Sequence, residues 1–201
     1  TALKPVLEMI PRAHGVDKVA ATNLMLTQRG PLFLSDTSIN PNPNAEELSK
    51  IALMTYQTVK MFGIDPAMAM VSYGNFGSSK LESPLKVSRA VNYLHTHFPD
   101  MIVDGEIQVD FALNQEMLKD KFPFSKLVNK KVNTLIFPNL DVANVTYKML
   151  KELNGATSIG PIILGLDYPV HVLQLGATVE EMVNMTAVAV IDAQQKQMKR
   201  R

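Results

Sequence analysis

Short apolar segments alternate along this chain with longer segments in which apolar residues recur every three or four positions. The runs at 67–72 and 133–137 are almost uniformly apolar and are bounded by proline or glycine, which is typical of strands buried on both faces of a sheet. The helical spacing is clearest between Ala45 and Phe62. Strands that alternate with helices predict an α/β fold, with a doubly wound sheet between two layers of helices.

Proline, asparagine and glycine mark where these elements begin and end. Ile39–Asn44 contains two X-Pro steps and is the strongest break, and Asn44 is well placed to cap the next helix. Gly30-Pro31 reads as a hairpin turn. We expect helices at 45–62, 84–98, 109–119, 141–153 (capped by Asp141) and from Thr178 (capping box with Glu181) to the tail, strands at 19–21, 24–27, 32–34, 67–72, 101–103, 133–137 and 169–173, and a further apolar segment at 158–164.

Folds of this class bind ligands at the carboxyl ends of their strands, which draws attention to three loops at 73–79, 138–144 and 174–178. The first reads Tyr-Gly-Asn-Phe-Gly-Ser-Ser. Its glycines allow a ligand to approach the backbone, and its hydroxyls and amides suit phosphate or acyl oxygens. It matches neither GxGxxG nor a P-loop, so an ordinary connection is the alternative.

Composition narrows the classes of function. The chain has 201 residues, a net charge of +1 and no cysteine. The charge argues against a nucleic-acid partner, and the missing cysteine excludes a disulfide framework, a cysteine-ligated zinc site and a thiol nucleophile. No apolar run approaches the roughly 18 residues of a membrane span, and the first residues lack a signal peptide pattern. We therefore expect a cytoplasmic protein with no membrane partner.

Other polar residues allow two interpretations each. Asp104, Glu106 and Asp110 suit acid–base or metal chemistry, but a solvated turn followed by a helix capped by Asp110 is favoured. The histidines lack metal-site spacing on a helix, so no metal is expected: His14, His95, His97 and His171.

Three cationic side chains and His171 also allow a functional and a structural interpretation. Lys80, Lys86 and Arg89 are suited to a nucleotide phosphate, although an exposed helix face is the usual setting for such charges. His171 alternates with valines, which favours a buried or interfacial histidine over a catalytic one.

Taken together, the ordered motifs resemble the C-terminal half of the phosphate acetyl/butyryltransferase family. The 73–79 loop, Pro169-Val-His-Val-Leu and Val183-Asn-Met-Thr-Ala more narrowly resemble the phosphotransacetylase-like domain at the C-terminus of large bacterial NADP-dependent malic enzymes. The resemblance extends over nearly the whole chain. The motifs that carry it, besides these, are Ile39–Leu48, Phe62-Gly-Ile, Val103-Asp-Gly-Glu, Phe137-Pro-Asn-Leu-Asp and Gly160-Pro-Ile.

This resemblance implies a three-layer, two-lobe fold like that of the isocitrate and isopropylmalate dehydrogenases, with a cleft between the lobes. Residues 12–160 would form an α/β lobe inserted in the first lobe, and residues 161–201 a return segment and C-terminal helix of the first lobe. Thr1 would then lie inside a longer transferase-like domain, and the final helix would be partly uncovered or paired with another chain.

The resemblance also exposes a departure at the active site. Active members of the family carry Ser-Arg-Gly and an aspartate five residues further on, where the serine helps to activate the thiol of coenzyme A and the arginine binds phosphoryl oxygens. Gln174, Leu175 and Glu181 stand at these positions here. Leucine offers no cationic fork for phosphate, so we expect acetyl transfer to be lost.

The function that the resemblance implies is a regulatory and oligomer-forming domain of a malic enzyme that converts malate to pyruvate. Acetyl-CoA would be its effector, NADP and Mg²⁺ or Mn²⁺ would bind in the absent malic enzyme domain, and the assembly would be at least a homodimer. An active phosphate acetyltransferase, which converts acetyl-CoA and phosphate to acetyl phosphate and CoA, is the alternative, and a dimerisation module without a ligand is a third. The expected ligand contacts are Asn75, Gly77, Ser78, Ser79, Asn139, Asn144, Gly160 and Gly165.

Overall fold

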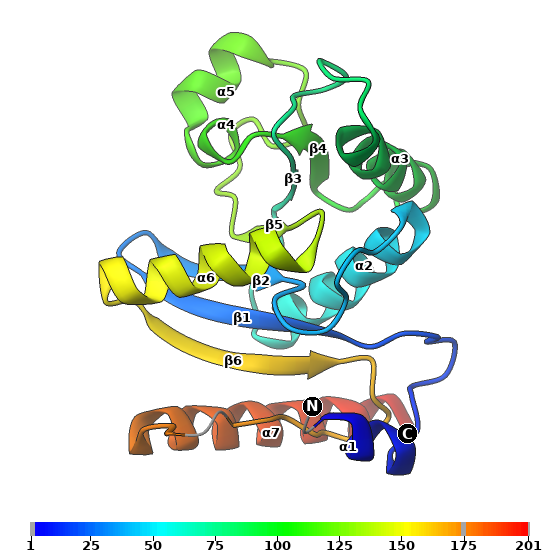
Figure 1. Ribbon diagram of the computed structural model, residues 1–201, viewed down its shortest axis with the longest axis vertical. Helices are drawn as coiled ribbons and strands as arrows, with labels where there is room; N and C mark the ends of the chain where they lie inside the picture. The colour runs from blue at the N-terminus through cyan, green and yellow to red at the C-terminus, as the bar shows by residue number, and fades with distance from the viewer. Residues whose placement is uncertain (1–2, 174–175, 201) are drawn as a thin grey trace.

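The computed structural model describes residues 3–173 and 176–200 and contains a six-stranded sheet with helices on both faces (Figure 1). The strand order is β4-β3-β5-β2-β1-β6. The strands are β1 (Ala20–Thr27), β2 (Gly30–Ser35), β3 (Met68–Val71), β4 (Val103–Ile107), β5 (Thr134–Ile136) and β6 (Thr157–Leu164). The helices are α1 (Leu3–Met9), α2 (Ala45–Met61), α3 (Glu82–His97), α4 (Val109–Leu113), α5 (Gln115–Lys121), α6 (Leu140–Asn154) and α7 (Val179–Arg200).

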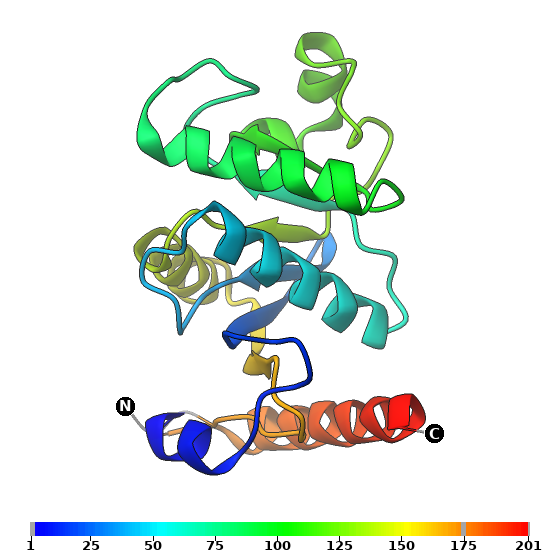
Figure 2. The same ribbon diagram turned by 90° about the vertical axis from the view of Figure 1, so that its right-hand side faces the viewer.

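The alternation of side chains along the strands builds two hydrophobic layers. On β3, Met68 and Met70 join the core under α2 and α3, whereas Ala69 and Val71 join the core under α4, α5 and α6. Figure 2 shows α2 and α3 side by side on their face of the sheet. The predicted three-layer α/β architecture is thereby confirmed.

The direction of the strands decides which loops meet. β2, β5, β3 and β4 are parallel, while β1 runs antiparallel to both β2 and β6. The carboxyl ends of the four parallel strands therefore share one edge of the sheet with the start of β1 and the end of β6. The β1–β2 hairpin turns at Gln28 and Arg29, so Gly30 and Pro31 begin β2 instead of forming the turn.

Local capping agrees with the sequence at α2 and differs at α6. The Asn44 side chain accepts from Glu47 N, and the Glu47 carboxylate accepts from Asn44 N, each at 2.9 Å. At α6 the cap is Asn139, whose Oδ1 accepts from Val142 N at 3.0 Å. Asp141 lies inside the first turn of α6 and does not cap it.

Two predicted elements take another form. The helix expected at 109–119 divides at Asn114, because the Asn114 side chain accepts from Glu116 N and Met117 N and caps a second short helix. The segment 169–173 is irregular and not a strand. Its alternating valines pack against a small core beside β1 and β6 without joining the ladder.

α7 lies beside β6 and α1 at one end of the molecule, in both views (Figures 1 and 2). Met185 and Val188 are buried against the sheet side, whereas Val179, Val183 and Val190 are at least half exposed. A partly uncovered helix agrees with the expectation from the family resemblance. The predicted boundary between residues 160 and 161 falls inside β6, and the division into an inserted lobe and a return segment stays a prediction.

Asp192 joins α7 to the irregular segment through His171 and pairs with Lys196 on its own helix. Asp192 Oδ2 lies 3.3 Å from His171 Nε2 and 2.7 Å from Lys196 Nζ, and His171 Nδ1 accepts from Ile163 N. The His171 side chain is therefore buried, as the sequence favoured, with Nδ1 hydrogen-bonded and Nε2 facing Asp192 without a hydrogen bond of good geometry. Burial alone would raise the pKa of Asp192, but its bonds to His171 and Lys196 outweigh this effect and hold the pKa below the ordinary 3.8.

Asp192→Asn is expected to lower the free energy of unfolding by about 1 kcal/mol at pH 7, because it removes a charge-assisted contact. The folded-state pKa is depressed, so this contribution is present above pH 3.8 and is lost as the pH falls through the folded pKa. Urea titrations of both proteins at several pH values measure it, with Glu180→Gln on the same helix as control. A difference that stays constant down to the lowest pH would assign the loss to packing instead of charge.

Candidate ligand site at the carboxyl edge of the sheet

The loop after β3 is a tightly hydrogen-bonded turn. Asn75 Oδ1 accepts from Gln108 N at 2.8 Å, and Asn75 N donates to Ser78 Oγ at 2.9 Å. Ser79 Oγ accepts from Leu81 N at 3.3 Å. Gly77 and Ser78 are exposed. Ser78 N donates to Asn75 O at 2.9 Å, so this loop is held by its own hydrogen bonds and its role in ligand binding stays a prediction.

Glu106 fastens this loop to the sheet. Its carboxylate is buried, and Oε1 accepts from Gly77 N at 2.5 Å, while its backbone carbonyl accepts from Phe76 N at 2.8 Å. Oε2 has no hydrogen-bond partner among the described residues. Phe76 has a positive φ of 44° and packs against Phe122 and Phe124. The loop conformation thus depends on a buried acid that the sequence did not assign to it.

The carboxylates near β4 correct the favoured interpretation of that segment. Asp104 and Glu106 do not lie in a solvated turn but in β4, paired with β3, and both are buried. Asp104 Oδ2 accepts from Ser125 Oγ and Lys126 N, each at 2.8 Å. Asp110 lies inside α4, and the residue at the cap position is Gln108. The sequence Asp104-Gly105-Glu106 is typical of a turn when it is considered alone. Its pairing with β3 in the folded protein makes it a strand.

Asp36 organises the loop after β2. Its buried carboxylate accepts from the backbone N–H groups of Ala21, Ser38, Ile39 and Asn40 and from the Asn40 side chain, at 2.5–3.2 Å. Burial raises the pKa of Asp36, and the hydrogen bonds from Ser38, Asn40 and Ile39 oppose that rise. The folded loop carries Asn42 and Asn44 to the start of α2.

Lys80, Lys86 and Arg89 come together beside that loop. Lys86 Nζ donates to Asn42 Oδ1 at 2.7 Å and to Pro138 O at 2.8 Å, which links the loop after β2 to the end of β5. Burial lowers the pKa of Lys86. Exposed Lys80 and Arg89 line the same cavity of about 470 Å³, next to the N-terminus of α2. Glu82 lines the same cavity, and the phosphate-binding role of the three cations stays a prediction.

The asparagines predicted on the second loop have structural partners. Asn139 caps α6, and Asn144 Nδ2 donates to Thr37 O at 3.1 Å. These side chains hold the ends of β5 and β2 together.

Gly160 and Gly165 serve the packing of β6. A Cβ on Gly160 would lie 2.1 Å from Asn23 Oδ1, and one on Gly165 would lie 2.9 Å from Met54 and Val16. β6 is separated from β3 by four strand spacings, about 19 Å. The structure therefore does not bring all eight predicted contacts into one pocket, and their ligand roles stay predictions.

Of the positions that depart from the family motif, Glu181 has a defined setting, while Gln174 and Leu175 lie outside the described residues. Glu181 Oε2 accepts from Thr178 N at 2.8 Å, and Oε1 accepts from Lys151 Nζ at 3.0 Å. The hydrogen bonds from Thr178 and Lys151 hold the pKa of Glu181 below its ordinary value. This carboxylate caps α7, as predicted. It also lines a cavity of about 240 Å³ with Gly160.

None of the helices in the described ranges combines the length and apolarity needed to cross a membrane. Groups of three metal-ligating side chains are likewise absent from residues 3–173 and 176–200.

The comparisons with known proteins place the chain in a class. Its structure superposes on a phosphotransacetylase from Streptococcus pyogenes with a TM-score of 0.87 and 34% identity, covering 98% of this chain and 59% of the other. A phosphotransacetylase from Staphylococcus aureus gives a TM-score of 0.85 at 30% identity, covering 96% of this chain and 59% of the other. The fold is thus that of a phosphotransacetylase.

The family follows from the sequence comparison. Residues 1–190 match the phosphate acetyl/butaryl transferase family, and the chain belongs to it. It is 39% identical over 181 residues to the NADP-dependent malic enzyme of Escherichia coli, covering 90% of this chain and 24% of the enzyme. It is 36% identical over 199 residues to the phosphate acetyltransferase of Clostridium acetobutylicum, covering 96% and 60%. The chain therefore spans about a quarter of the length of the Escherichia coli malic enzyme and three fifths of the length of the Clostridium acetobutylicum phosphate acetyltransferase.

Proposed function

We propose that this chain is part of a regulatory and oligomer-forming domain of a cytoplasmic NADP-dependent malic enzyme, which binds acetyl-CoA and has lost acetyl transfer. The observation that carries the proposal is the replacement of the family's active-site residues in this chain. Gln174 and Leu175 replace the serine and arginine of active family members, and Glu181 is committed to capping α7 and pairing with Lys151. Without the cationic fork, acetyl transfer to phosphate loses transition-state stabilisation, at a cost on the order of 10² or more in rate.

The carboxyl edge supports ligand binding without that chemistry. Lys80, Lys86 and Arg89 suit the phosphates of coenzyme A, and the side chains of Lys80 and Arg89 are exposed to solvent. Acetyl-CoA regulates the parent enzyme only if it binds two conformational states with different affinity. NADP and Mg²⁺ or Mn²⁺ would act in the malic enzyme part, and exposed apolar side chains on α7 suit contact with the rest of the domain or with a second subunit.

Calorimetry and kinetics on the full-length protein test this function. We expect saturable binding of acetyl-CoA, a change in the rate of malate oxidation on binding, and no phosphate-dependent release of free thiol from acetyl-CoA. Phosphate-dependent turnover would favour the alternative, an active phosphate acetyltransferase. Absence of binding, or binding without any change in malate kinetics, would contradict the regulatory function.

The cavity lined by Lys80, Lys86 and Arg89 allows a separate test of acetyl-CoA binding. Lys80→Gln/Arg89→Gln should weaken acetyl-CoA binding roughly tenfold, because two charge-assisted contacts to phosphate are lost. The loss should shrink at high salt, since both side chains are exposed. Lys60→Gln/Lys119→Gln removes the same charge away from the cavity and should bind like the parent protein. Equal weakening in both double variants would show a general charge effect.

A further inference from the structure

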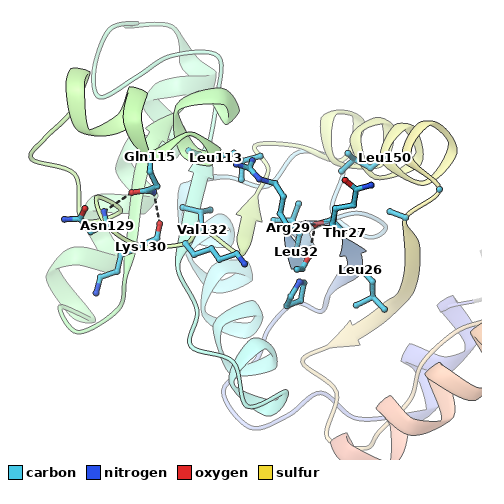
Figure 3. A pocket seen from close by; sticks show the side chains of 17 residues that line it. Leu26, Thr27, Arg29, Leu32, Leu113, Gln115, Asn129, Lys130, Val132 and Leu150 are labelled. Carbon is cyan, nitrogen blue, oxygen red and sulfur yellow. Dashed lines mark hydrogen bonds between the residues drawn. The ribbon is translucent and has the colours of Figure 1, made fainter.

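A second cavity, of about 940 Å³, opens at the amino edge of the sheet, opposite the loops described above (Figure 3). Its lining comes from the β1–β2 hairpin, the residues that precede β5 and β6, the end of α4 and the start of α5. The volume lies within the range of pockets that hold small molecules, roughly 300–1,000 Å³.

The inner lining is an extension of the hydrophobic core. Leu32, Leu113, Val132, Leu150 and Ala156 pack against the core under α4, α5 and α6, yet each is only partly buried. They remain accessible because the cavity opens between the hairpin and α4. An apolar group entering here would complete the burial of these side chains, which gives a favourable free energy in proportion to the area covered.

The rim is cationic. Arg29 and Lys130 lie on the two facing sides of the cavity in Figure 3. Lys131 Nζ lies beside Gly30, 3.4 Å from the position that a Cβ there would take. Among the described residues that line the cavity, none is acidic. An anionic group is therefore complementary to this rim, whereas a cation is repelled.

Hydrogen bonds fix both walls. Gln115 Nε2 donates to Lys130 O at 2.7 Å, and Gln115 Oε1 accepts from Asn129 N at 2.8 Å. On the hairpin, Thr27 Oγ1 donates to Gly30 O at 2.8 Å and accepts from Arg29 N at 3.1 Å. A ligand therefore meets a site whose backbone is already ordered, which reduces the entropic cost of binding.

We propose that this cavity binds an aliphatic carboxylate, with its chain on the apolar lining and its carboxylate at Arg29 on the cationic rim. Arg29 offers the planar donor pair that fits a carboxylate. This site is separate from the proposed acetyl-CoA site at the carboxyl edge, because the two cavities share no lining residue.

Calorimetric titration of the full-length protein with octanoate tests the class of ligand. Saturable binding of octanoate is expected, with octylammonium at least tenfold weaker because of its opposite charge. Acetate should give no detectable binding, since it has no chain to bury. Equal binding of octanoate and octylammonium, or no saturable octanoate binding, would overturn the proposal without affecting the acetyl-CoA experiments.

Variants then locate the site. Arg29→Gln should weaken octanoate roughly tenfold, and Leu113→Asp should abolish it, while Lys119→Gln, an exposed lysine of α5 outside the cavity, should change nothing. Unchanged melting temperatures would show that the Arg29 and Lys119 variants remain folded. Sedimentation then tests whether the cavity is instead an interface between two copies of the chain. If the parent protein is an oligomer that does not bind octanoate, and Leu113→Asp dissociates it, the proposal is overturned and the cavity is assigned to a contact with a second copy.

Discussion

Gly105→Ala is expected to lower the free energy of unfolding by at least about 3 kcal/mol, through a clash between neighbouring strands. Gly105 lies in β4 opposite Met70, with a φ of +144°. A Cβ at this position would lie 2.4 Å from the Met70 carbonyl oxygen, which is backbone and has no rotamer to escape into. The strands would have to separate where Glu106 holds the loop after β3. Chemical denaturation measures the loss, and weaker acetyl-CoA binding should accompany it.

Gly63→Ala is the matched control for Gly105→Ala. Gly63 also has a positive φ, +71°, but a Cβ there would meet nothing within 4 Å. Its cost should be limited to backbone strain, about 1 kcal/mol. Similar losses at Gly63 and Gly105 would contradict the expected clash with β3, because the φ of Gly105 also tolerates a side chain less well.

Asp36→Ala is expected to destabilise the protein by about 3 kcal/mol or more, because it leaves buried donors without an acceptor. Five N–H groups point at the Asp36 carboxylate, and together they fold the loop after β2. The same loop supplies Asn42, which holds Lys86. The variant should therefore lose acetyl-CoA affinity together with stability, which denaturant unfolding and calorimetry would show.

Asp36→Asn and Asp141→Ala distinguish the loss of a buried hydrogen-bond acceptor from the loss of a negative charge. The asparagine keeps one acceptor oxygen and should recover part of the lost stability. Asp141 is exposed in the first turn of α6, and its removal should cost no more than about 0.5 kcal/mol. A large effect at Asp141 would contradict the view that the buried network, and not negative charge in general, stabilises this region.

Local chemistry made part of the fold predictable. The capping boxes of Asn44 with Glu47 and Thr178 with Glu181 need only residues three positions apart, so the starts of α2 and α7 follow from the sequence. Apolar runs identified β3 and β5 for a similar reason. The segment 169–173 shows the limit of such patterns, because valines alternate there without a neighbouring strand to pair with.

The sequence by itself determined the α/β class, the loop after β3 and the family, since these depend on local periodicity and on ordered motifs. Only the tertiary structure decided which side chains meet. Strand order buries Asp104 and Glu106 in β4, brings Lys80, Lys86 and Arg89 to one cavity, and sets Gly160 four strands away from the loop after β3. These relations depend on contacts between distant segments, which pairing and packing fix and which no local pattern encodes.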